Sequence, residues 1–346
     1  MDGPRRERRG PSARSSVIAV DLGASRLRVA AVEPDGSISG RAERATRVTD
    51  GPSAVIADAI GLIEAIRARG ADRGRAADRA RSSIVAIGIG APGPVDPVAG
   101  RLLEPPNLGP AFRDVPLAAE IAAATGLPTV LDRDTNVALL GECAFGAAKG
   151  ARHAIYLTVS TGVGGAVLAD GRLLAGASGL AGELGHVVVD LDGPLCGCGA
   201  RGHLEAYSSG VGIARAARAA IERGTAPGLA DIATRIGLQA ISARDVAEAE
   251  ERGDADAAAI MELARRAFAA ALVGMVDVFA PEVIVVGGGI AMAQGERLLG
   301  PARDAVRATA FRSAASLVRI VPAALGDDVG LVGALALVRA RGGLLG

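Results

Sequence analysis

Four residues that can bind a metal ion are concentrated in one glycine-rich stretch of the chain. They are His186, Cys196, Cys198 and His203. Imidazole nitrogen and thiolate sulfur are ligands that zinc prefers, and four of them complete a tetrahedral shell with no open position. The spacing therefore predicts a structural zinc (Zn²⁺) site rather than solvated loop residues. Such a site would also fix Glu183 and Glu205, which lie on either side of these ligands.

Two short turns carry small residues where a ligand could approach the backbone. They read Asp21-Leu22-Gly23-Ala24-Ser25 and Ser160-Thr161-Gly162-Val163-Gly164-Gly165. Backbone N–H groups in such turns suit phosphate oxygens. A plain hairpin turn would explain either segment alone, but the matching pair favours two loops that clamp a polyphosphate. The candidate contacts are Gly23, Ser25 and the nearby Arg28 in the first turn, and Thr161, Gly162 and Gly164 in the second.

A third glycine-rich segment, Gly287-Gly288-Gly289, joins an apolar strand to a helix. Consecutive glycines there would let a flat ring or a ribose lie against the main chain. A tight connection between strand and helix explains the same residues equally well.

Two carboxylates flank the start of a predicted helix in the sequence Asp132-Arg133-Asp134-Thr135-Asn136. One of them can cap the helix while the other faces a ligand. Capping alone would explain Asp134. If its side chain instead lies against a substrate hydroxyl, Asp134 can act as a general base in phosphoryl transfer, which needs an aligned nucleophile and a proton acceptor.

An internal duplication organises the elements that position these residues. Residues 17–38 and 154–174 each read as strand, glycine turn, strand, Asp-Gly turn and strand, which argues against a dinucleotide-binding βαβ unit. Further strands are expected at 84–90, 129–132, 283–286 and 318–321, and helices near 53–69, 115–125, 137–145, 295–307 and from 328. The chain is therefore predicted to be an α/β protein with two β-β-β-α-β-α domains facing each other across a cleft.

The domain limits follow from the same pattern. Residues 1–16 read as a disordered basic tail, 17–133 as the first domain, and 134–327 as the second domain with the metal loop. The closing helix, about 328–346, is expected to pack back on the first domain. The Arg-, Ala- and Gly-rich stretch 70–83 is predicted to be a surface excursion.

Composition excludes several classes of function. The chain has 346 residues with 38 basic and 38 acidic side chains, so no overall charge attracts nucleic acid or membrane lipid. Lys149 lies in Ala-Lys-Gly, so no Walker A loop is present. The apolar stretch 268–286 contains Asp277, Pro281 and Glu282 and reads as a buried helix, a turn and a strand. The three cysteines form a poor disulfide framework, which favours reduced thiols and the cytoplasm.

At these residues the chain resembles the ROK family of sugar kinases and sugar-responsive repressors, built on the actin-like ATPase fold (ribonuclease H-like). The resemblance spans nearly the whole chain after the basic tail. The matching segments, in order, are the turn at Asp21, Gly88 to Asp96, Asn107-Leu108, Asp134 to Glu142, Ser160 to Gly165, Glu183 to His186, the cysteine loop, and Gly287 to Ala291.

The resemblance implies an ATP-dependent hexose kinase with Asp134 as the catalytic base. It places Glu183, His186, Glu205, Asn107 and Gly93 at the sugar. It also implies that the two turns hold the ATP phosphates with magnesium (Mg²⁺), that Gly287 to Gly289 contact the adenosine, and that the protein is a homodimer. Glucose is the default substrate, with an N-acetylhexosamine or fructose as alternatives.

A non-catalytic sugar-binding regulator is a further alternative. A repressor is disfavoured because about sixteen residues before the first strand are too few for a three-helix DNA-binding unit.

Three positions depart from the family pattern. The usual Gly-Gly-Thr of the first phosphate loop is Gly23-Ala24-Ser25, and the third cysteine of the metal loop is His203, which can still bind zinc. The asparagine that usually precedes the catalytic aspartate and binds sugar is Arg133. An arginine cannot simply replace an amide, so either Arg133 turns away from the sugar or the pocket prefers a different sugar.

Overall fold

The computed structural model describes residues 15–74 and 83–342, which fold into two compact units. Of the described residues, the first unit comprises 15–74, 83–150, 175–180 and 324–342, and the second comprises 151–174 and 181–323. Residues 1–14 of the predicted basic tail and most of the predicted excursion at 70–83 lie outside the described residues. The first strand begins at Ser16, within the predicted tail, and this serine is buried.

The first unit is built on a mixed sheet with the strand order β3-β2-β1-β4-β7. The strands are β1 (Ser16–Leu22), β2 (Arg26–Val32), β3 (Ile38–Ala45), β4 (Ile84–Ala91) and β7 (Thr129–Arg133). Strands β1, β4 and β7 are parallel, whereas β2 and β3 pair antiparallel. A small ribbon, β5 (Val95–Asp96) and β6 (Arg101–Leu102), follows β4.

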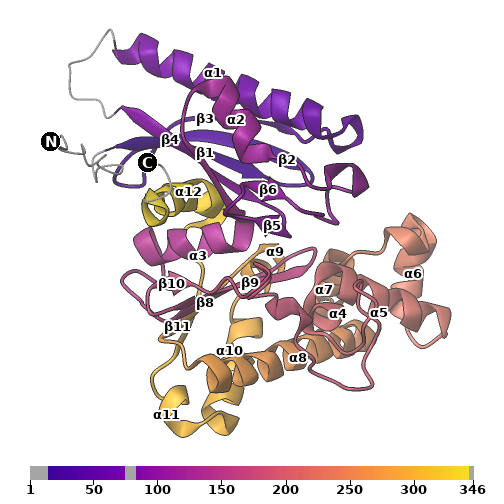
Figure 1. The fold of residues 1–346 in the computed structure, drawn as a ribbon. Helices are drawn as coiled ribbons and strands as arrows, with labels where there is room; N and C mark the ends of the chain where they lie inside the picture. Colours follow the sequence, from indigo (N-terminus) through magenta and orange to yellow (C-terminus); the bar gives the residue numbers. More distant parts are fainter. Residues whose placement is uncertain (1–14, 75–82, 343–346) are drawn as a thin grey trace, which may run out of the picture. The chain divides into compact units, whose positions relative to one another are not determined.

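Four helices cover the two faces of this sheet (Figure 1). They are α1 (Pro52–Gly74), α2 (Leu117–Thr125), α3 (Asp134–Phe145) and α12 (Val329–Ala340). Because side chains alternate along a strand, Ile18 and Val20 join the core with α1 and α2 while Val17 and Ala19 join the core with α3 and α12. Each face therefore buries its own apolar layer.

Helix α12 packs closely on α3 because both carry glycine at the contact. A Cβ atom at Gly333 would lie 2.1 Å from the carbonyl oxygen of Val137. The buried carboxylate of Glu142 accepts from the N–H groups of Ala147, Ala324 and Leu325. These contacts place α3 and the chain up to Gly150 in the first unit, beyond the boundary that the sequence predicts near Asp134.

The second unit repeats the plan with the strand order β10-β9-β8-β11-β12. Its strands are β8 (Ala154–Val159), β9 (Val163–Ala169), β10 (Arg172–Leu173), β11 (Val283–Gly287) and β12 (Arg319–Pro322). Strands β8, β11 and β12 are parallel, and β9 and β10 are antiparallel. Both sheets thus show the duplicated order that the sequence predicts.

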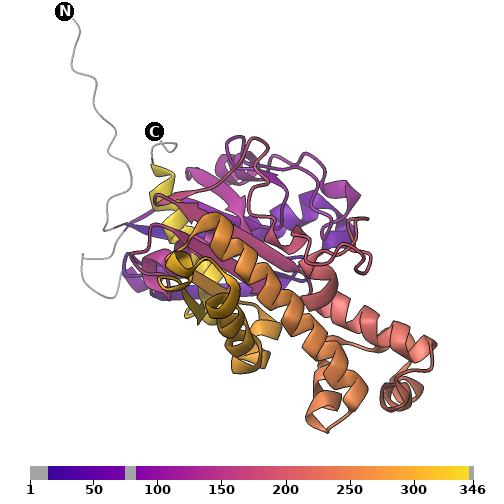
Figure 2. The same cartoon turned by 90° about the horizontal axis from the view of Figure 1, so that it is seen from below.

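The helices of the second unit form two layers, with α8 continuous through both (Figure 2). One core joins the sheet to α8 (Ala255–Phe279) and α10 (Glu296–Thr309). The other joins the first half of α8 to α5 (Gly210–Glu222), α6 (Pro227–Ile236) and α7 (Ala243–Glu251). Shorter helices are α4 (Leu204–Ser208), α9 (Gly289–Gln294) and α11 (Arg312–Ala315).

The stretch 268–286 is the end of α8, a turn and β11, as the sequence predicts. No helix among the described residues is long and apolar enough to cross a membrane.

Asp58 on α1 offers a test of how the first unit is held together. Its side chain is 6% exposed and accepts from Arg47 at 2.8 and 2.9 Å and also from Arg44 of β3. The hydrogen bonds from Arg47 hold the pKa of Asp58 below its usual value. Asp58→Asn should lower the free energy of unfolding at pH 7 by about 1.5–3 kcal/mol, the range for hydrogen bonds to a charged group.

Because the folded-state pKa of Asp58 is depressed, this stabilisation is present above the unfolded pKa of about 3.9 and is lost as the pH falls through the folded value. Urea unfolding of both proteins from pH 7 down to pH 3 checks the sign. An equal difference at all pH values would contradict an ionised Asp58.

Candidate functional sites

The carboxyl ends of three parallel strands meet at one edge of the first sheet. Asp21 of β1 pairs in register with Gly90 of β4, which pairs with Asp132 of β7. Helix α3 begins at Asp134, directly after β7. Ligands of open α/β sheets bind outside the carboxyl ends of the strands. This edge is therefore where the first unit presents its polar groups.

Asp134 is an exposed carboxylate at the first position of α3. The N-cap residue is Arg133, which makes no side-chain capping bond, and Asp134 accepts from the N–H of the adjacent Thr135 at 2.7 Å. Asp134 is thus not the capping residue of this helix. Its exposed position at the strand edge is suitable for contact with a substrate.

Asp132 plays a different part, because it is buried. Its oxygens accept from the backbone of Arg133 at 2.8 Å, from Asn136 Nδ2 at 2.7 Å and from Arg341 at 2.9 Å. These bonds fix the connection between β7 and α3. Of the two carboxylates around the helix start, the inner one supports the backbone and the outer one reaches the surface.

Arg133 and Gly93, both predicted to be sugar contacts, lie together in the first unit. The Arg133 side chain is buried and donates to Asn136 Oδ1 at 3.4 Å. A Cβ atom at Gly93 would lie only 2.9 Å from Arg133 Cδ. Arg133 therefore packs inward along the chain after β4. Asn107 is exposed in the turn that follows β6.

The first phosphate turn lies at the end of β1. Gly23 donates to the Arg26 carbonyl at 2.9 Å and accepts from Thr46 Oγ1 at 2.7 Å, and Ser25 is exposed. Arg28 donates to Asp21 Oδ2 at 2.9 Å and to the Asp327 carbonyl at 2.6 Å. The guanidinium group of Arg28 thus holds Asp21 rather than projecting into the turn.

Asp21 is a candidate that the sequence interpretation did not assign. Burial raises its pKa, and the neighbouring Arg28 partly offsets this effect. A Cβ atom at Gly330 would lie 2.9 Å from Asp21 Cγ, so a larger residue at 330 would crowd the carboxyl group. The available signal was an acidic residue one position before the end of an apolar strand.

In the second unit, the second phosphate turn and the glycine segment share one strand edge. Gly287 of β11 pairs in register with Thr158 of β8, so the turn after β8 and Gly288-Gly289 emerge side by side. Gly288 has φ of +92°, and a Cβ there would lie 2.5 Å from the Val159 carbonyl oxygen. Only glycine fits this close crossing.

A cavity of about 790 Å³ opens beside this edge, within the range of small-molecule sites. Thr161 and Gly289 both line it, so the structure brings together two segments predicted to bind nucleotide. Gly162, Gly164, Gly287 and Gly288 belong to the same two segments. The remaining wall comes from α5, α7, α8, α9 and the residues between α6 and α7, including Val211, Ile213, Arg218, Gln239, Ile241, Glu248, Met261 and Gln294.

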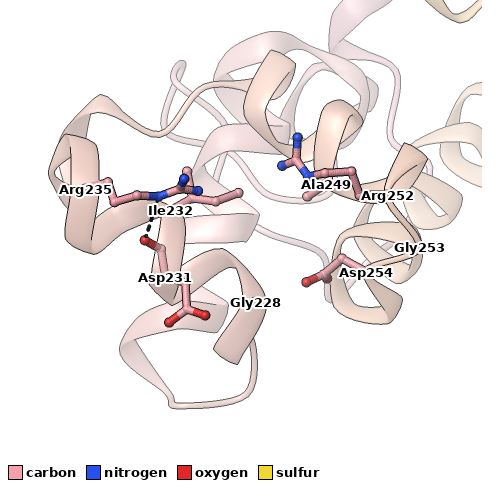
Figure 3. A pocket seen from close by; sticks show the side chains of 8 residues that line it. All are labelled: Gly228, Asp231, Ile232, Arg235, Ala249, Arg252, Gly253 and Asp254. Carbon is pink, nitrogen blue, oxygen red and sulfur yellow. Dashed lines mark hydrogen bonds between the residues drawn. The ribbon is translucent and has the colours of Figure 1, made fainter.

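A smaller cavity of about 380 Å³ lies between α6 and the turn from α7 to α8 (Figure 3). Arg235 and Arg252 line it together with Asp231 and Asp254. Asp254 accepts from Ala257 N and caps α8, and Arg235 donates to the Asp231 carbonyl. Charges of both signs therefore line this cavity.

The predicted metal ligands form a compact cluster. The four ligand atoms of His186, Cys196, Cys198 and His203 all lie within 4.8 Å of one another. The two histidine Nδ1 atoms are 3.2 Å apart, Cys198 Sγ is 3.3 Å from His203 Nδ1, and Cys196 Sγ is 3.8 Å from His186 Nδ1. A tetrahedron with Zn–N of about 2.0 Å and Zn–S of about 2.3 Å has edges of about 3.3–3.8 Å. The cluster therefore fits a zinc ion.

Glu205 lies between the metal cluster and the second phosphate turn. Its Oε2 accepts from Val163 N at 2.9 Å, and its Oε1 lies 3.7 Å from Cys196 Sγ. A Cβ at Gly162 would be 2.7 Å from Oε2, so the glycine makes room for this carboxylate. Glu205 thus holds the turn directly.

Glu183 is the N-cap of the short 3₁₀ helix Leu184–His186, and His186 is its last residue. This helix lies against β9 because a Cβ at Gly185 would fall 2.0 Å from the Val163 carbonyl oxygen. Glu183 is exposed and His186 is half-buried. The structure therefore brings His186 and Glu205 together at Cys196, and Glu183 precedes the 3₁₀ helix that lies against Val163.

Two sheets of one plan, each with polar groups at the carboxyl edge, define an α/β protein with the actin-like ATPase fold, which is also the fold of its structural neighbours. The sequence model of the ROK family matches residues 17–341 of this chain. The chain belongs to the ROK family, as the sequence motifs indicate.

Named relatives are sugar kinases. The chain is 35% identical to the glucokinase of Thermotoga maritima, over 94% of this chain and 98% of the relative. It is 31% identical to the N-acetylmannosamine kinase of Escherichia coli, over 94% and 98%. The structure of a ROK family glucokinase from Streptomyces griseus in complex with glucose and AMPPNP is 31% identical, with a TM-score of 0.73 and coverage of 94% and 99%.

Proposed function

We propose that this protein is an ATP-dependent sugar kinase that phosphorylates a hexose hydroxyl, with glucose as the first candidate substrate. The observation that carries the proposal is the exposed Asp134 carboxylate, which lies at the carboxyl edge of the first sheet and is not used to cap α3. The identity to glucokinases over most of the chain supports the same reaction.

Asp134 accepts the proton of the attacking hydroxyl. The hydroxyl oxygen then forms a bond to the γ-phosphorus of ATP, and the bond from that phosphorus to the bridging oxygen breaks, so that ADP leaves. The turns at Gly23–Ser25 and Thr161–Gly164 hold the phosphate oxygens through N–H groups other than those of Gly23 and Val163, which donate to Arg26 and Glu205, and Gly289 lies at the adenosine side. Magnesium, when bound with ATP, neutralises phosphate charge.

Arg28 supports this arrangement indirectly. Because its guanidinium group is bonded to Asp21, we assign it to fixing the β1 edge rather than to direct phosphate contact. Asp21 then presents a carboxylate beside the first turn.

Glu183, His186 and Glu205 contact the sugar hydroxyls from the second unit, and Gly93, Asn107 and Arg133 belong to the pocket in the first. Arg133 is buried against Gly93, so it supports Gly93 by packing and does not itself reach the sugar. His186, Cys196, Cys198 and His203 would bind zinc, which would hold His186 and Glu205 in place.

The alternative substrates are N-acetylmannosamine, another N-acetylhexosamine or fructose. Arg133 favours them because it replaces the asparagine amide that binds sugar in the family pattern. A non-catalytic sugar-binding regulator is the second alternative. The retained Asp134 favours catalysis over it.

A coupled assay of ADP release with ATP and a panel of hexoses tests the function. We expect turnover with glucose or with one of the alternative sugars. Sugar binding without turnover for every member of the panel would instead identify a regulator. The preferred sugar follows from the ratio of kcat/KM values.

We further propose a cytoplasmic homodimer with no nucleic-acid partner, acting in carbohydrate metabolism. The neutral net charge supports the absence of nucleic-acid binding. Light scattering after gel filtration measures the oligomeric state.

A further inference from the structure

Gln294 is a buried amide at the wall of the 790 Å³ cavity. It is the last residue of α9, its side chain is 8% exposed, and it lines the cavity. The sequence analysis assigned only glycines to the adenosine and no side chain that could recognise the base. A buried amide that faces a cavity can fix the orientation of a ligand.

The orientation of this amide is set by Arg265 of α8. Arg265 NH1 donates to Gln294 Oε1 at 3.2 Å, and its other N–H groups donate to Glu250 at 2.7 and 3.3 Å and to Glu262 at 3.3 Å. Because a guanidinium group can only donate, the amide oxygen must face Arg265. The amide nitrogen of Gln294 therefore points elsewhere.

The NH₂ group is the part of the Gln294 amide that does not contact Arg265. Among the described residues, no hydrogen bond takes up Gln294 Nε2, and the atom is not sealed from solvent. Since the side chain lines the cavity, this donor is accessible from it. The Arg265–Gln294 pair thus presents a fixed donor to whatever occupies the cavity.

The position of Gln294 favours a base over a phosphate. Helix α9 starts at Gly289, where a Cβ would lie 4.0 Å from Ser160 Oγ at the phosphate turn. Gln294 lies about 7.5 Å further along the helix, at 1.5 Å per residue. Apolar side chains also line the cavity, including Ile213, Ile241, Met261 and Ile290, and they suit a flat ring better than a phosphate.

We propose that the Gln294 amide donates a hydrogen bond to an accepting ring nitrogen of the purine base, and that Arg265 is the positioning residue that keeps this donor facing the cavity. The inference rests on the proposed function, because it takes the cavity as the nucleotide site. Where the acceptor is N1, Gln294 also distinguishes adenine from guanine, whose N1 carries a hydrogen; N3 and N7 accept in both purines.

The direct test is Gln294→Glu, which keeps the oxygen on Arg265 and replaces the donor by an acceptor of the same shape. Gln239→Glu is the matched control, because Gln239 also lines the cavity and acquires the same charge. We expect ATP to bind about tenfold to a hundredfold more weakly to Gln294→Glu than to Gln239→Glu, as for the loss of a buried hydrogen bond. Calorimetry in the absence of sugar measures this ratio.

Three deaza analogues of ATP, each with C–H in place of N1, N3 or N7, identify the acceptor. In the wild type one analogue should bind about tenfold more weakly than ATP, and Gln294→Met should abolish that difference. Equal ATP binding by Gln294→Glu and Gln239→Glu, or equal binding of all analogues by the wild type, would overturn the inference. No ATP binding by the wild type would instead overturn the nucleotide function itself.

Discussion

Replacing Asp134 by asparagine is expected to lower kcat by about 100-fold to 10,000-fold, the contribution of a general base. The amide is nearly isosteric with the carboxylate but cannot accept the hydroxyl proton as a base. Its Oδ1 can still accept from Thr135 N, as the carboxylate of Asp134 does at the start of α3. The fold and the start of the helix should therefore persist.

Sugar binding should change little in the same variant, because proton transfer is needed in the transition state and not in the ground state. We expect kcat to fall while the Kd for sugar stays within a few-fold of the wild type. Steady-state kinetics and calorimetry with the preferred sugar measure the two quantities separately.

Asp35→Asn is a matched control for this experiment. Asp35 is an exposed aspartate of the same unit, in the turn between β2 and β3, and its Oδ1 accepts from Ser37 N at 2.9 Å. The control should retain full activity. An Asp134→Asn enzyme that turns over at the wild-type rate would refute the general-base role.

Removing one metal ligand is the second change with a large expected effect. Cys196 is 2% exposed in the cluster and lies 3.7 Å from Glu205, which in turn holds Val163 in the phosphate turn. We expect Cys196→Ser to reduce bound zinc from about one per chain to almost none, because structural zinc supplies much of the order of such loops. The KM for sugar should rise at least about tenfold, since His186 loses its fixed orientation.

Elemental analysis of the purified protein counts the zinc, and sugar titrations measure the KM. Cys143→Ser is the control, because Cys143 is a half-buried cysteine of α3 outside the cluster. Stoichiometric zinc in the Cys196→Ser protein would contradict the ligand assignment. An unchanged sugar KM in zinc-free protein would contradict the positioning role.

The zinc affinity should also fall as the pH is lowered. Burial raises the pKa of the Cys196 thiol, so the metal-free protein keeps this proton to a higher pH than an exposed cysteine would. Zinc must displace the proton to bind the thiolate. A competition titration with a chelator of known affinity between pH 6 and pH 8 measures the slope.

Local sequence patterns were sufficient for much of the fold. The strands at 84–90, 129–132, 283–286 and 318–321 are observed as β4, β7, β11 and β12, each within about one residue of its predicted limits. Alternating apolar residues and glycine turns are local signals, so they can be read without knowledge of partners. The spacing of the four metal ligands likewise predicted that they cluster.

The parts that could not be predicted depend on residues far apart in the chain. Its place near a turn predicted that Arg28 contacts phosphate. Its hydrogen bonds to Asp21 and to the Asp327 carbonyl form only when the chain packs, so the sequence could not indicate them. The burial of Arg133 against Gly93 joins β7 to the segment after β4. The wall of the large cavity comes from helices whose amphipathic patterns show only which face is apolar.

The order of residues alone determined the duplicated strand plan, the four-ligand metal loop and the family motifs, because each is carried by neighbours in the chain. Only the tertiary structure decided which carboxylate is buried and which is exposed at the start of α3, and which way the Gln294 amide points. Those outcomes depend on hydrogen-bond donors brought in from distant helices, Arg341 to Asp132 and Arg265 to Gln294, and a sequence does not specify such partners until the chain has packed.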